Sequence, residues 1–220
     1  MKQKLSAILL TLSLNASNYA HYEPSKMAQK FFNNCDVVLD KFYYQNCYDY
    51  SKKSSLAVAY KLDKNMLEAG HIKNRPKFEP DYKLAKKYRT DWNDYLHSGY
   101  DRGHILSNQS MNATTDAQRS TFLMSNIAPQ TPELNRNVWL KAEKRERQVA
   151  LAKGWAEVIN LIEFDENNKR YIKNGIRVPN YFVKIILSDN FQECFRMPNI
   201  EMFENDKLKT YRVDCGEFNG

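Results

Sequence analysis

Glycine and proline are scarce in this sequence, which holds only seven of each among its 220 residues. Internal repeats, heptad runs and Ser/Gly linkers are absent as well. This composition excludes a fibrous or low-complexity chain, and an aromatic share of 13% supplies material for a core. Because the length suits one buried core better than two domains and a linker, we predict a single domain over residues 21–220.

The sequence also lacks any apolar run of the roughly 20 residues that a membrane span needs. The run from Leu5 to Leu14 is shorter, follows Lys2 and Lys4, and leads into small and polar residues up to Ala20. That order is typical of a secretory signal peptide, although a short amphipathic first helix is the alternative. We predict that residues 1–20 are a signal peptide and that the mature protein is periplasmic or secreted, without a membrane span.

Cysteine is rare too, and none of the four cysteines lies in the C-x-x-C spacing of a zinc site. They fall as two local pairs, Cys35 with Cys47 and Cys194 with Cys215. Two disulfides, one in each terminal extension of the domain, are the simple interpretation and agree with an exported protein. Four cysteines nevertheless allow three pairings, and four buried thiols are a further alternative.

Acidic residues are outnumbered by basic ones, 26 against 33, which leaves a formal charge of +7. Removal of Lys2 and Lys4 with the signal peptide would leave a mature charge of +5. Such a surplus favours polyanionic partners such as nucleic acid. Many unrelated proteins have a similar positive charge, so the charge alone does not identify a nucleic-acid-binding protein.

The hydrophobic pattern predicts strands on both sides of one long helix. Leu56, Val58 and Tyr60 alternate as in a half-buried strand, and β-branched or aromatic residues fill 156–164 and 181–187. The stretch 135–153 contains neither glycine nor proline and ends at Gly154, which predicts a helix. This order indicates an α+β fold.

Two other segments are harder to interpret. Residues 81–96 mix helical periodicity with many lysines. Residues 22–50 predict an irregular, bridged N-terminal lobe, whose aromatics either fill a small core, the favoured interpretation, or stack on bases. These aromatics are Phe31, Phe32, Phe42, Tyr43 and Tyr44.

Four side chains of the predicted helix recur at intervals of four residues: Asn135, Trp139, Glu143 and Arg147. Residues at this spacing share one broad helix face, so an amide, a carboxylate and a guanidinium would project toward a common place. In the alternative interpretation Trp139 packs in the core, Asn135 caps the helix, and Glu143 and Arg147 form an exposed ion pair.

The string SGYDRGHIL at residues 98–106 resembles the signature of the DNA/RNA non-specific endonucleases, a branch of the ββα-metal or His-Me finger nucleases. The resemblance continues through SNIAPQ at 125–130, LNRNVWLKAE at 134–143 and VPNYFVKI at 178–185, and covers roughly residues 56–190. It implies an α+β fold with a mixed, mainly antiparallel sheet and a long metal-binding helix.

The resemblance also implies roles for individual residues. The histidine of the Asp-Arg-Gly-His motif is the family's general base, which points to His104, and its neighbour Arg102 would stabilise phosphate and transition-state charge. The asparagine of the Leu-Asn pair is the family's only protein ligand of the metal, which points to Asn135. Glu143 resembles the carboxylate that orients water around the metal.

Three further residues match the family at the edges of its site. Arg147 resembles an arginine that holds a phosphate, and Asn126 matches a site asparagine that we group with the catalytic residues. Arg75 matches an upstream substrate-binding arginine, in a looser part of the alignment.

These assignments agree with the chemistry of phosphodiester hydrolysis, which needs a deprotonated water, positive charge on the phosphate and help for the leaving 3′ oxygen. An unperturbed imidazole titrates near 6.5, so His104 can be a free base at neutral pH. An ion with one neutral amide ligand keeps most of its waters, which suits Mg²⁺, with Mn²⁺ able to substitute. The expected activity is sugar-non-specific cleavage of DNA and RNA that leaves 5′ phosphates.

The chain departs from the family pattern in a few places. Asn137 stands where the family commonly has glycine, Ala142 where it often has leucine, and residues 159–163 lack the usual glycine-containing turn. These departures concern the outer pocket and substrate groove more than the centre. A non-catalytic nucleic-acid-binding protein and a phosphodiesterase for another substrate are the alternative functions.

Overall fold

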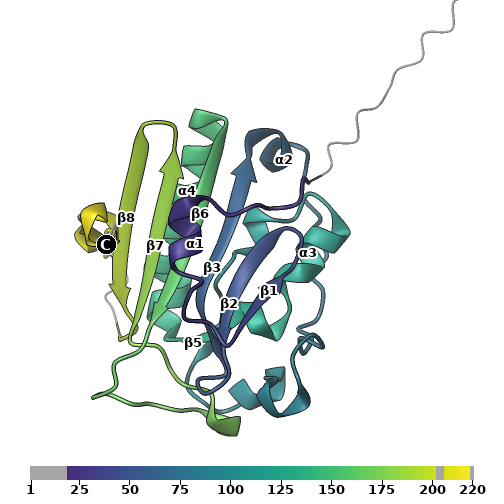
Figure 1. The fold of residues 1–220 in the computed structure, drawn as a ribbon, viewed down its shortest axis with the longest axis vertical. Coiled ribbons are helices and arrows are strands. Elements are labelled where there is room, and N and C mark those ends of the chain that lie inside the picture. Colours follow the sequence, from purple (N-terminus) through teal and green to yellow (C-terminus); the bar gives the residue numbers. More distant parts are fainter. Residues whose placement is uncertain (1–18, 202–205, 219–220) are drawn as a thin grey trace, which may run out of the picture.

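A seven-stranded antiparallel sheet forms the centre of the computed structural model, which describes residues 19–201 and 206–218 (Figure 1). The predicted signal peptide lies outside the described residues except for Tyr19 and Ala20. The strand order is β1-β2-β3-β6-β7-β8-β9. The strands are β1 (Val37–Asp40), β2 (Tyr44–Asp49), β3 (Ser54–Asp63), β6 (Trp155–Glu163), β7 (Tyr181–Ser188), β8 (Phe191–Pro198) and β9 (Arg212–Val213).

A second, two-stranded sheet pairs β4 (Asp101–His104) with β5 (Ile127–Gln130) in antiparallel register. Four α-helices and a π-helical turn accompany the sheets in the described part of the chain. The helices are α1 (Lys26–Lys30), α2 (Lys64–Glu68), α3 (Thr115–Thr121) and α4 (Leu140–Lys153), and the π-helical turn, Leu134–Trp139, leads directly into α4. The predicted α+β class, with a mainly antiparallel sheet and one long helix, is confirmed.

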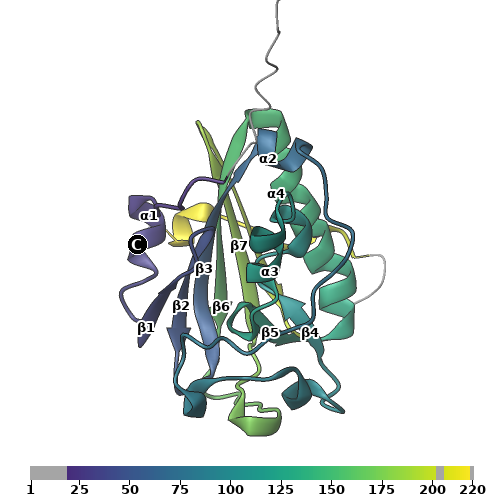
Figure 2. The same cartoon turned by 90° about the vertical axis from the view of Figure 1, so that its right-hand side faces the viewer.

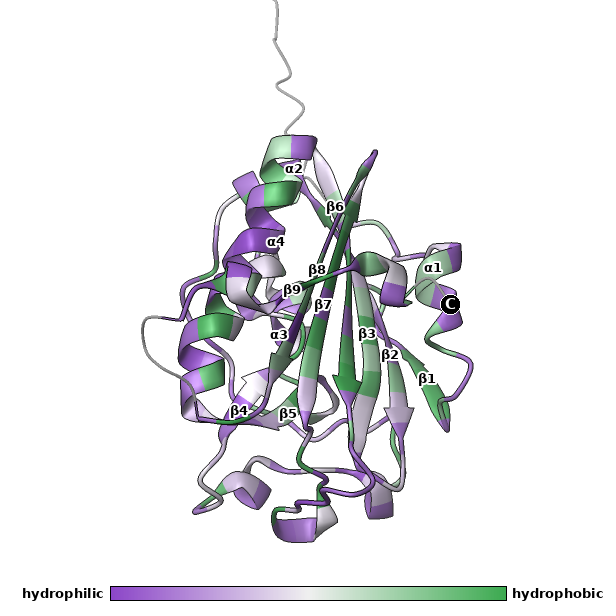
Figure 3. Cartoon of the chain, turned by 90° about the vertical axis from the view of Figure 1, so that its left-hand side faces the viewer, coloured by the Kyte–Doolittle hydropathy of each residue, from purple (hydrophilic) through white to green (hydrophobic). Residues whose placement is uncertain are grey.

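The main sheet is covered on both faces. Figure 2 shows α3, α4 and the small sheet on one side of it, and α1 with the C-terminal segment on the other. Side chains alternate along β6, so that Val158 and Ile162 enter the core under α4 while Ile159 and Leu161 enter the opposite core. Figure 3 shows hydrophobic residues gathered along the central strands β3 and β7.

The predicted helix and strands are found with small shifts. Strands β3, β6 and β7 contain the predicted segments to within a residue. Helix α4 ends at Lys153, directly before Gly154, whose φ of 89° favours glycine. The helix begins differently, because Leu134–Trp139 forms a π-helical turn before α4. The prediction of one regular helix over 135–153 was therefore wrong at its start.

The N-terminal segment is more regular than predicted. Residues 37–49 contribute β1 and β2 to the main sheet, and Tyr44 is fully buried in its core. Residues 81–96 hold two short 3-10 turns, Lys86–Tyr88 and Trp92–Tyr95, the second closed by a capping box on Asp91.

Both local cysteine pairs form disulfides. Cys35–Cys47 joins the segment after α1 to β2, and Cys194–Cys215 joins β8 to the C-terminal turn. Cys47, Cys194 and Cys215 are buried in the core on the face opposite α4. Within the described ranges, the structure holds no helix long and apolar enough to cross a membrane.

Candidate active site

The Asp-Arg-Gly-His motif forms the whole of strand β4. Its last residue, His104, pairs with Ile127 of β5, and Gly103 pairs with Ala128. A Cβ atom on Gly103 would lie 2.2 Å from Oε1 of Gln130, a fully buried side chain. The motif therefore needs glycine so that Gln130 can pack against the strand.

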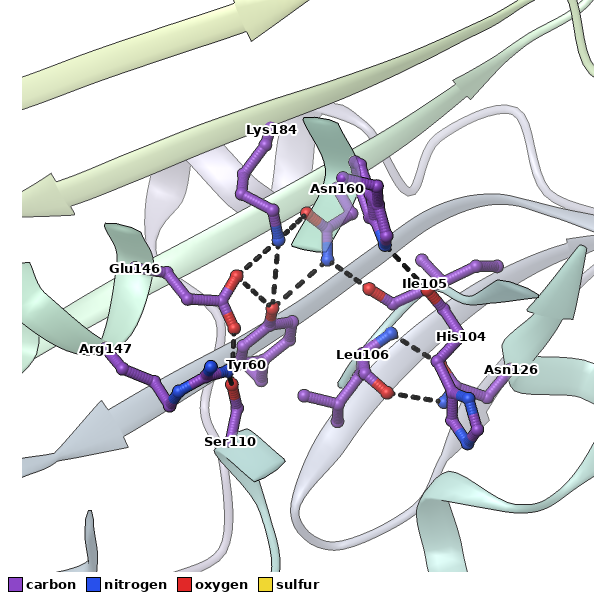
Figure 4. Close-up of polar contacts among 11 residues, drawn as sticks. Tyr60, His104, Ile105, Leu106, Ser110, Asn126, Glu146, Arg147, Asn160 and Lys184 are labelled. Carbon is purple, nitrogen blue, oxygen red and sulfur yellow. Dashed lines mark hydrogen bonds and ion pairs between the residues drawn. The ribbon is translucent and has the colours of Figure 1, made fainter. Parts of the chain in front are cut away.

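The backbone around His104 is held from two directions (Figure 4). Trp139, in the turn before α4, donates its indole Nε1–H to the His104 carbonyl at 2.9 Å. Asn160 of β6 donates its amide to the carbonyl of Ile105 at 2.8 Å. The end of β4 is thus fixed to both the helix and the main sheet.

The His104 ring is enclosed by aromatic side chains. Its centroid lies 5.5 Å from that of Phe78 and 4.9 Å from that of Phe122, and the residue is only 9% exposed. In the described part of the chain its Nε2 atom has no hydrogen-bond partner. Burial, assisted by the positive charge of Arg75, lowers the pKa of His104 to about 3. The imidazole is therefore a neutral ring with an unused nitrogen.

A cavity of about 270 Å³ opens over this ring. It is lined by five of the seven site residues predicted from the sequence, which come from distant parts of the chain. These five are Arg75, Arg102, His104, Asn135 and Glu143. Ser107, Asn108, Gln109 and Leu140 complete the lining.

Two guanidinium groups contact the same two aromatic rings as His104. Arg102 lies 5.4 Å from the Phe78 ring and Arg75 lies 5.3 Å from the Phe122 ring. The buried Nε of Arg102 has no partner within the described ranges. These two positive groups in the lining of one cavity suit an anion that presents several oxygens.

Asn135 reaches the cavity from the π-helical turn. Its amide Nδ2 donates to Asp101 at 2.9 Å, and Asp101 also accepts two hydrogen bonds from Arg136, both at 2.8 Å. Because a carboxylate only accepts, this contact leaves the carbonyl oxygen of Asn135 for the cavity. Burial alone would raise the pKa of Asp101, but the hydrogen bonds from Arg136 and Asn135 outweigh it and lower that pKa.

Glu143 lines the same cavity from the first turn of α4. Burial raises its pKa to about 7, with a further contribution from the nearby carboxylate of Glu146. Ser107, also in the cavity lining, is hydrogen-bonded to it. The cavity therefore carries a carboxyl group that titrates close to neutral pH.

Arg147 and Asn126 lie outside this cavity. Arg147 donates to Ser110 at 3.1 Å and to Gln109 at 3.2 Å. Among the described residues it forms no ion pair with Glu143, although its charge acts to lower the pKa of that carboxyl group. Asn126 is fully buried, and its side chain exchanges hydrogen bonds with the backbone of Leu106 at 2.9 and 3.0 Å. Asn126 holds the segment that follows His104.

A buried polar cluster close to Glu143 was not predicted from the sequence (Figure 4). Lys184 and Glu146 form a fully buried ion pair, Lys184 also donates to Asn160 at 2.8 Å, and Tyr60 donates to Glu146 at 2.9 Å. Ser110 donates to Glu146 at 2.6 Å and accepts from Arg147, so its hydroxyl links the cluster to Arg147. A single lysine within the apolar run of β7 was the signal that could have revealed it.

A short antiparallel pair carries a histidine, and the helical segment after it brings an asparagine and a glutamate to the same cavity. This arrangement defines the ββα-metal nuclease class of fold. The family model of the DNA/RNA non-specific endonucleases matches residues 23–220, and the chain belongs to that family.

Known relatives agree with this membership. Mitochondrial endonuclease G of Homo sapiens is 30% identical over 187 residues, a match that covers 77% of this chain and 62% of the human protein. A nuclease of Nostoc sp. is 37% identical over 105 residues, covering 47% of this chain and 38% of its own length. The chain thus spans less than two thirds of the length of these relatives. A crystal structure of the EndoG/EndoGI complex contains the same fold, with a TM-score of 0.74, 24% identity and 89% coverage of each chain.

Proposed function

We propose that this chain is a metal-dependent endonuclease that hydrolyses phosphodiester bonds of DNA and RNA with little sequence preference. The observation that carries the proposal is the buried, unpartnered Nε2 of His104 at a cavity that Arg75 and Arg102 also line. Membership of the DNA/RNA non-specific endonuclease family supports it.

His104 acts as the general base in this proposal. Its low pKa keeps the ring neutral at any working pH, and a negatively charged phosphodiester beside it raises that pKa toward the range of an efficient base. The ring takes a proton from the attacking water as the water oxygen bonds to phosphorus. The bond from phosphorus to the 3′ oxygen then breaks, which leaves a 5′ phosphate on one fragment.

Arg102 and Arg75 bind the non-bridging phosphate oxygens and stabilise the charge that grows on them. Both guanidinium groups rest against aromatic rings, so they are positioned before the substrate arrives. The leaving 3′ oxygen takes its proton from solvent.

The residues present fit a metal ion held mainly through water. Asn135, whose amide is held by Asp101, and Glu143 both line the cavity and could offer a carbonyl oxygen and a carboxylate to such an ion. Among the residues that the structure describes, no group of three or more His, Cys, Asp or Glu side chains could cage an ion. Mg²⁺, or Mn²⁺ in its place, would supply positive charge to the phosphate and the leaving oxygen.

The same proposal includes export. The order of charge and apolar residues in 1–20 supports a signal peptide, and two disulfides support an oxidising compartment. Mass spectrometry of the protein recovered from the periplasm and the medium checks both the cleavage point and the destination. Recovery of an uncleaved N-terminus from the cytoplasm would contradict export.

The decisive experiment compares His104→Asn with His97→Asn on supercoiled plasmid and on RNA, in Mg²⁺ and in EDTA. His97 is an exposed histidine with a φ of 59°, a conformation that asparagine tolerates, so it is a matched control. We expect His104→Asn to lose at least about 10²-fold in turnover, as for the loss of a general base, while the control keeps full activity.

Each alternative function gives a different result in this experiment. Binding of DNA without cleavage by the wild type would indicate a nucleic-acid-binding protein. Hydrolysis of small phosphodiesters alone, with DNA and RNA left intact, would indicate a phosphodiesterase for another substrate. Cleavage that persists in EDTA would overturn the metal dependence.

A further inference from the structure

Lys184 is a single cation in an apolar part of the core. Phe182 and Ile186, its neighbours on the same face of β7, belong to the core under α4, and Lys184 is itself fully buried. Its ion pair with Glu146 does not by itself explain a lysine here, because an apolar pair of similar volume is often as stable. The other contacts of its ammonium group therefore indicate what the charge does.

Two of these contacts lead to the backbone at and after His104. The Nζ atom of Lys184 lies 4.5 Å from the centre of the Trp139 ring, and Trp139 donates its indole N–H to the His104 carbonyl. The same Nζ donates to Oδ1 of Asn160 at 2.8 Å, and Nδ2 of Asn160 donates to the Ile105 carbonyl at 2.8 Å (Figure 4). Both side chains that hold residues 104 and 105 thus contact one ammonium group.

The ammonium group also decides which way the Asn160 amide faces. It can only donate hydrogen bonds, so it requires the Oδ1 atom of Asn160 on its own side. The Nδ2 atom is then directed away from it, toward the Ile105 carbonyl and the Tyr60 hydroxyl, which is 3.2 Å away. Without the charge of Lys184 the amide could reverse, and its oxygen would then face the Ile105 carbonyl, with which it forms no hydrogen bond.

Glu146 fixes the position of this ammonium group relative to α4. It pairs with Lys184 from the helix, three residues after Glu143, which lines the cavity over His104. Its carboxylate also accepts a hydrogen bond from Tyr60 of β3 at 2.9 Å. The helix that carries Glu143 and the strand that carries His104 are therefore both held against the same buried charge.

We propose that Lys184 is a positioning residue for the cleavage reaction, which holds the backbone of His104 in place against α4 through Trp139 and Asn160. Lys184 is fully buried and so does not itself contact the substrate. The inference rests on the proposed function, because it concerns the placement of the general base.

The test removes the charge of Lys184 without leaving Glu146 unpaired. Lys184→Met combined with Glu146→Leu replaces both ends of the ion pair, so the double variant should fold. Its kcat on a short DNA duplex should fall about 10- to 100-fold, the effect of a small misplacement of a catalytic group. Its KM should hardly change, because Arg75 and Arg102 are held by other side chains, the rings of Phe122 and Phe78.

Tyr60→Phe is the matched control. It removes a buried hydrogen bond to the same Glu146 carboxylate but leaves in place those that Trp139 and Asn160 donate to residues 104 and 105. Its kcat should therefore stay at the wild-type value. A loss of kcat in Tyr60→Phe as large as in the double variant would mean that any damage to this cluster slows cleavage, and it would overturn the specific role of Lys184.

Two further variants show whether the effect passes through His104. Asn160→Leu removes one of the two contacts and keeps the ion pair, so it should cause part of the same loss of kcat even if the double variant does not fold. In the His104→Asn background, Lys184→Met with Glu146→Leu should lower turnover no further, because no base is left to position. A full additional loss in that background would show that the charge acts elsewhere.

The outcomes also separate this inference from the proposed function. Wild-type kcat in folded Lys184→Met, Glu146→Leu protein, with cleavage still dependent on His104, would overturn the positioning role alone. A wild type that cleaves neither DNA nor RNA would instead overturn the proposed function.

Discussion

His104 is held in the folded protein as a neutral side chain, with consequences for stability as well as chemistry. Burial, and then the charge of Arg75, lowers its pKa to about 3, whereas in the unfolded chain it titrates near 6.5. Below about pH 6.5 the unfolded chain therefore binds a proton that the folded protein does not. Stability should fall as the pH is lowered from 6.5 toward 3.

Urea unfolding of the wild type and His104→Asn in EDTA, between pH 7.5 and 5, measures this contribution. The free energy of unfolding of the variant relative to the wild type should rise by up to about 1.4 kcal/mol per pH unit below 6.5. Glu143, whose pKa is raised to about 7, acts in the opposite direction but is present in both proteins. Parallel pH profiles would contradict the buried, neutral His104.

Asp101 is a second residue whose role can be tested by substitution, because it holds the side chain of Asn135. Its carboxylate accepts the Asn135 amide at 2.9 Å and so presents the carbonyl oxygen of Asn135 to the cavity. Asp101→Ala frees that amide to rotate, and loss of such an orienting contact typically costs about 10- to 100-fold in metal affinity. Mn²⁺ binding followed by electron paramagnetic resonance, alongside the Mg²⁺ dependence of cleavage, checks this expectation.

Arg136→Ala is the control, because it removes a different partner of Asp101 and leaves the contact to Asn135 in place. It should weaken Mn²⁺ binding much less. Equal Mn²⁺ affinities in the wild type and Asp101→Ala would show that Asp101 does not orient a metal ligand.

At the scale of elements, the strong periodic patterns were predictable and the irregular starts were not. Strands β6 and β7 and the end of α4 at Gly154 follow from residue type and spacing alone. The π-helical turn Leu134–Trp139 could not be predicted, because residue preferences do not distinguish it from the start of an α-helix. Strands β1 and β2 were missed because Tyr44, the first residue of β2, follows Phe42 and Tyr43 and was grouped with them as a local aromatic cluster.

The candidate site also has a part that could be predicted from the sequence and a part that could not. The motif around His104 and the spacing of Asn135 and Glu143 bring together residues that do line one cavity. The ion pair of Glu146 with Lys184 escaped notice because Glu146 lies in a run of charged residues that resembles a solvated helix face. Only the packing of α4 on the sheet shows that this one position points inward.

That ion pair makes a prediction about how α4 is joined to the sheet. Lys184→Met leaves the fully buried Glu146 carboxylate without its cation, which should cost about 3–5 kcal/mol in the free energy of unfolding. Combining it with Glu146→Leu should recover much of the loss, because the unpaired charge is then removed. Urea unfolding at neutral pH measures both.

The exposed pair of Lys64 and Glu68, 3.9 Å apart, provides the comparison. Lys64→Met should cost no more than about 0.5 kcal/mol, as expected for a surface pair at this spacing. If Lys184→Met were equally mild, the buried pair would have no structural role.

At the scale of the whole molecule, the two disulfides and the candidate active site lie on opposite faces of the main sheet. Figure 2 shows α1 and the C-terminal segment on the face away from α4, β4 and β5. Stability and catalysis should therefore respond separately to loss of a disulfide. Replacing both Cys194 and Cys215 by serine should lower the free energy of unfolding by roughly 3 kcal/mol on the chain-entropy estimate.

Cleavage per folded molecule, measured well below the lowered Tm, should stay at the wild-type value in that double variant. The Cys35→Ser, Cys47→Ser variant should behave alike, since its disulfide also lies away from the cavity. A large loss of activity in folded protein would mean that the two faces of the sheet are coupled.

The strand that carries His104 is not part of the main sheet. In the described part of the chain, β4 and β5 share no ladder with the seven strands. A side chain of the main sheet, Asn160 of β6, reaches the residue after His104, and Trp139 ties His104 to the turn before α4. Side-chain bridges can open without breaking a backbone ladder, so the two sheets should behave as separate cooperative units. Deuterium exchange should then be faster at the amides of β4 and β5 than at those of β6 and β7. The pair of strands around His104 would open repeatedly while the main sheet stays closed.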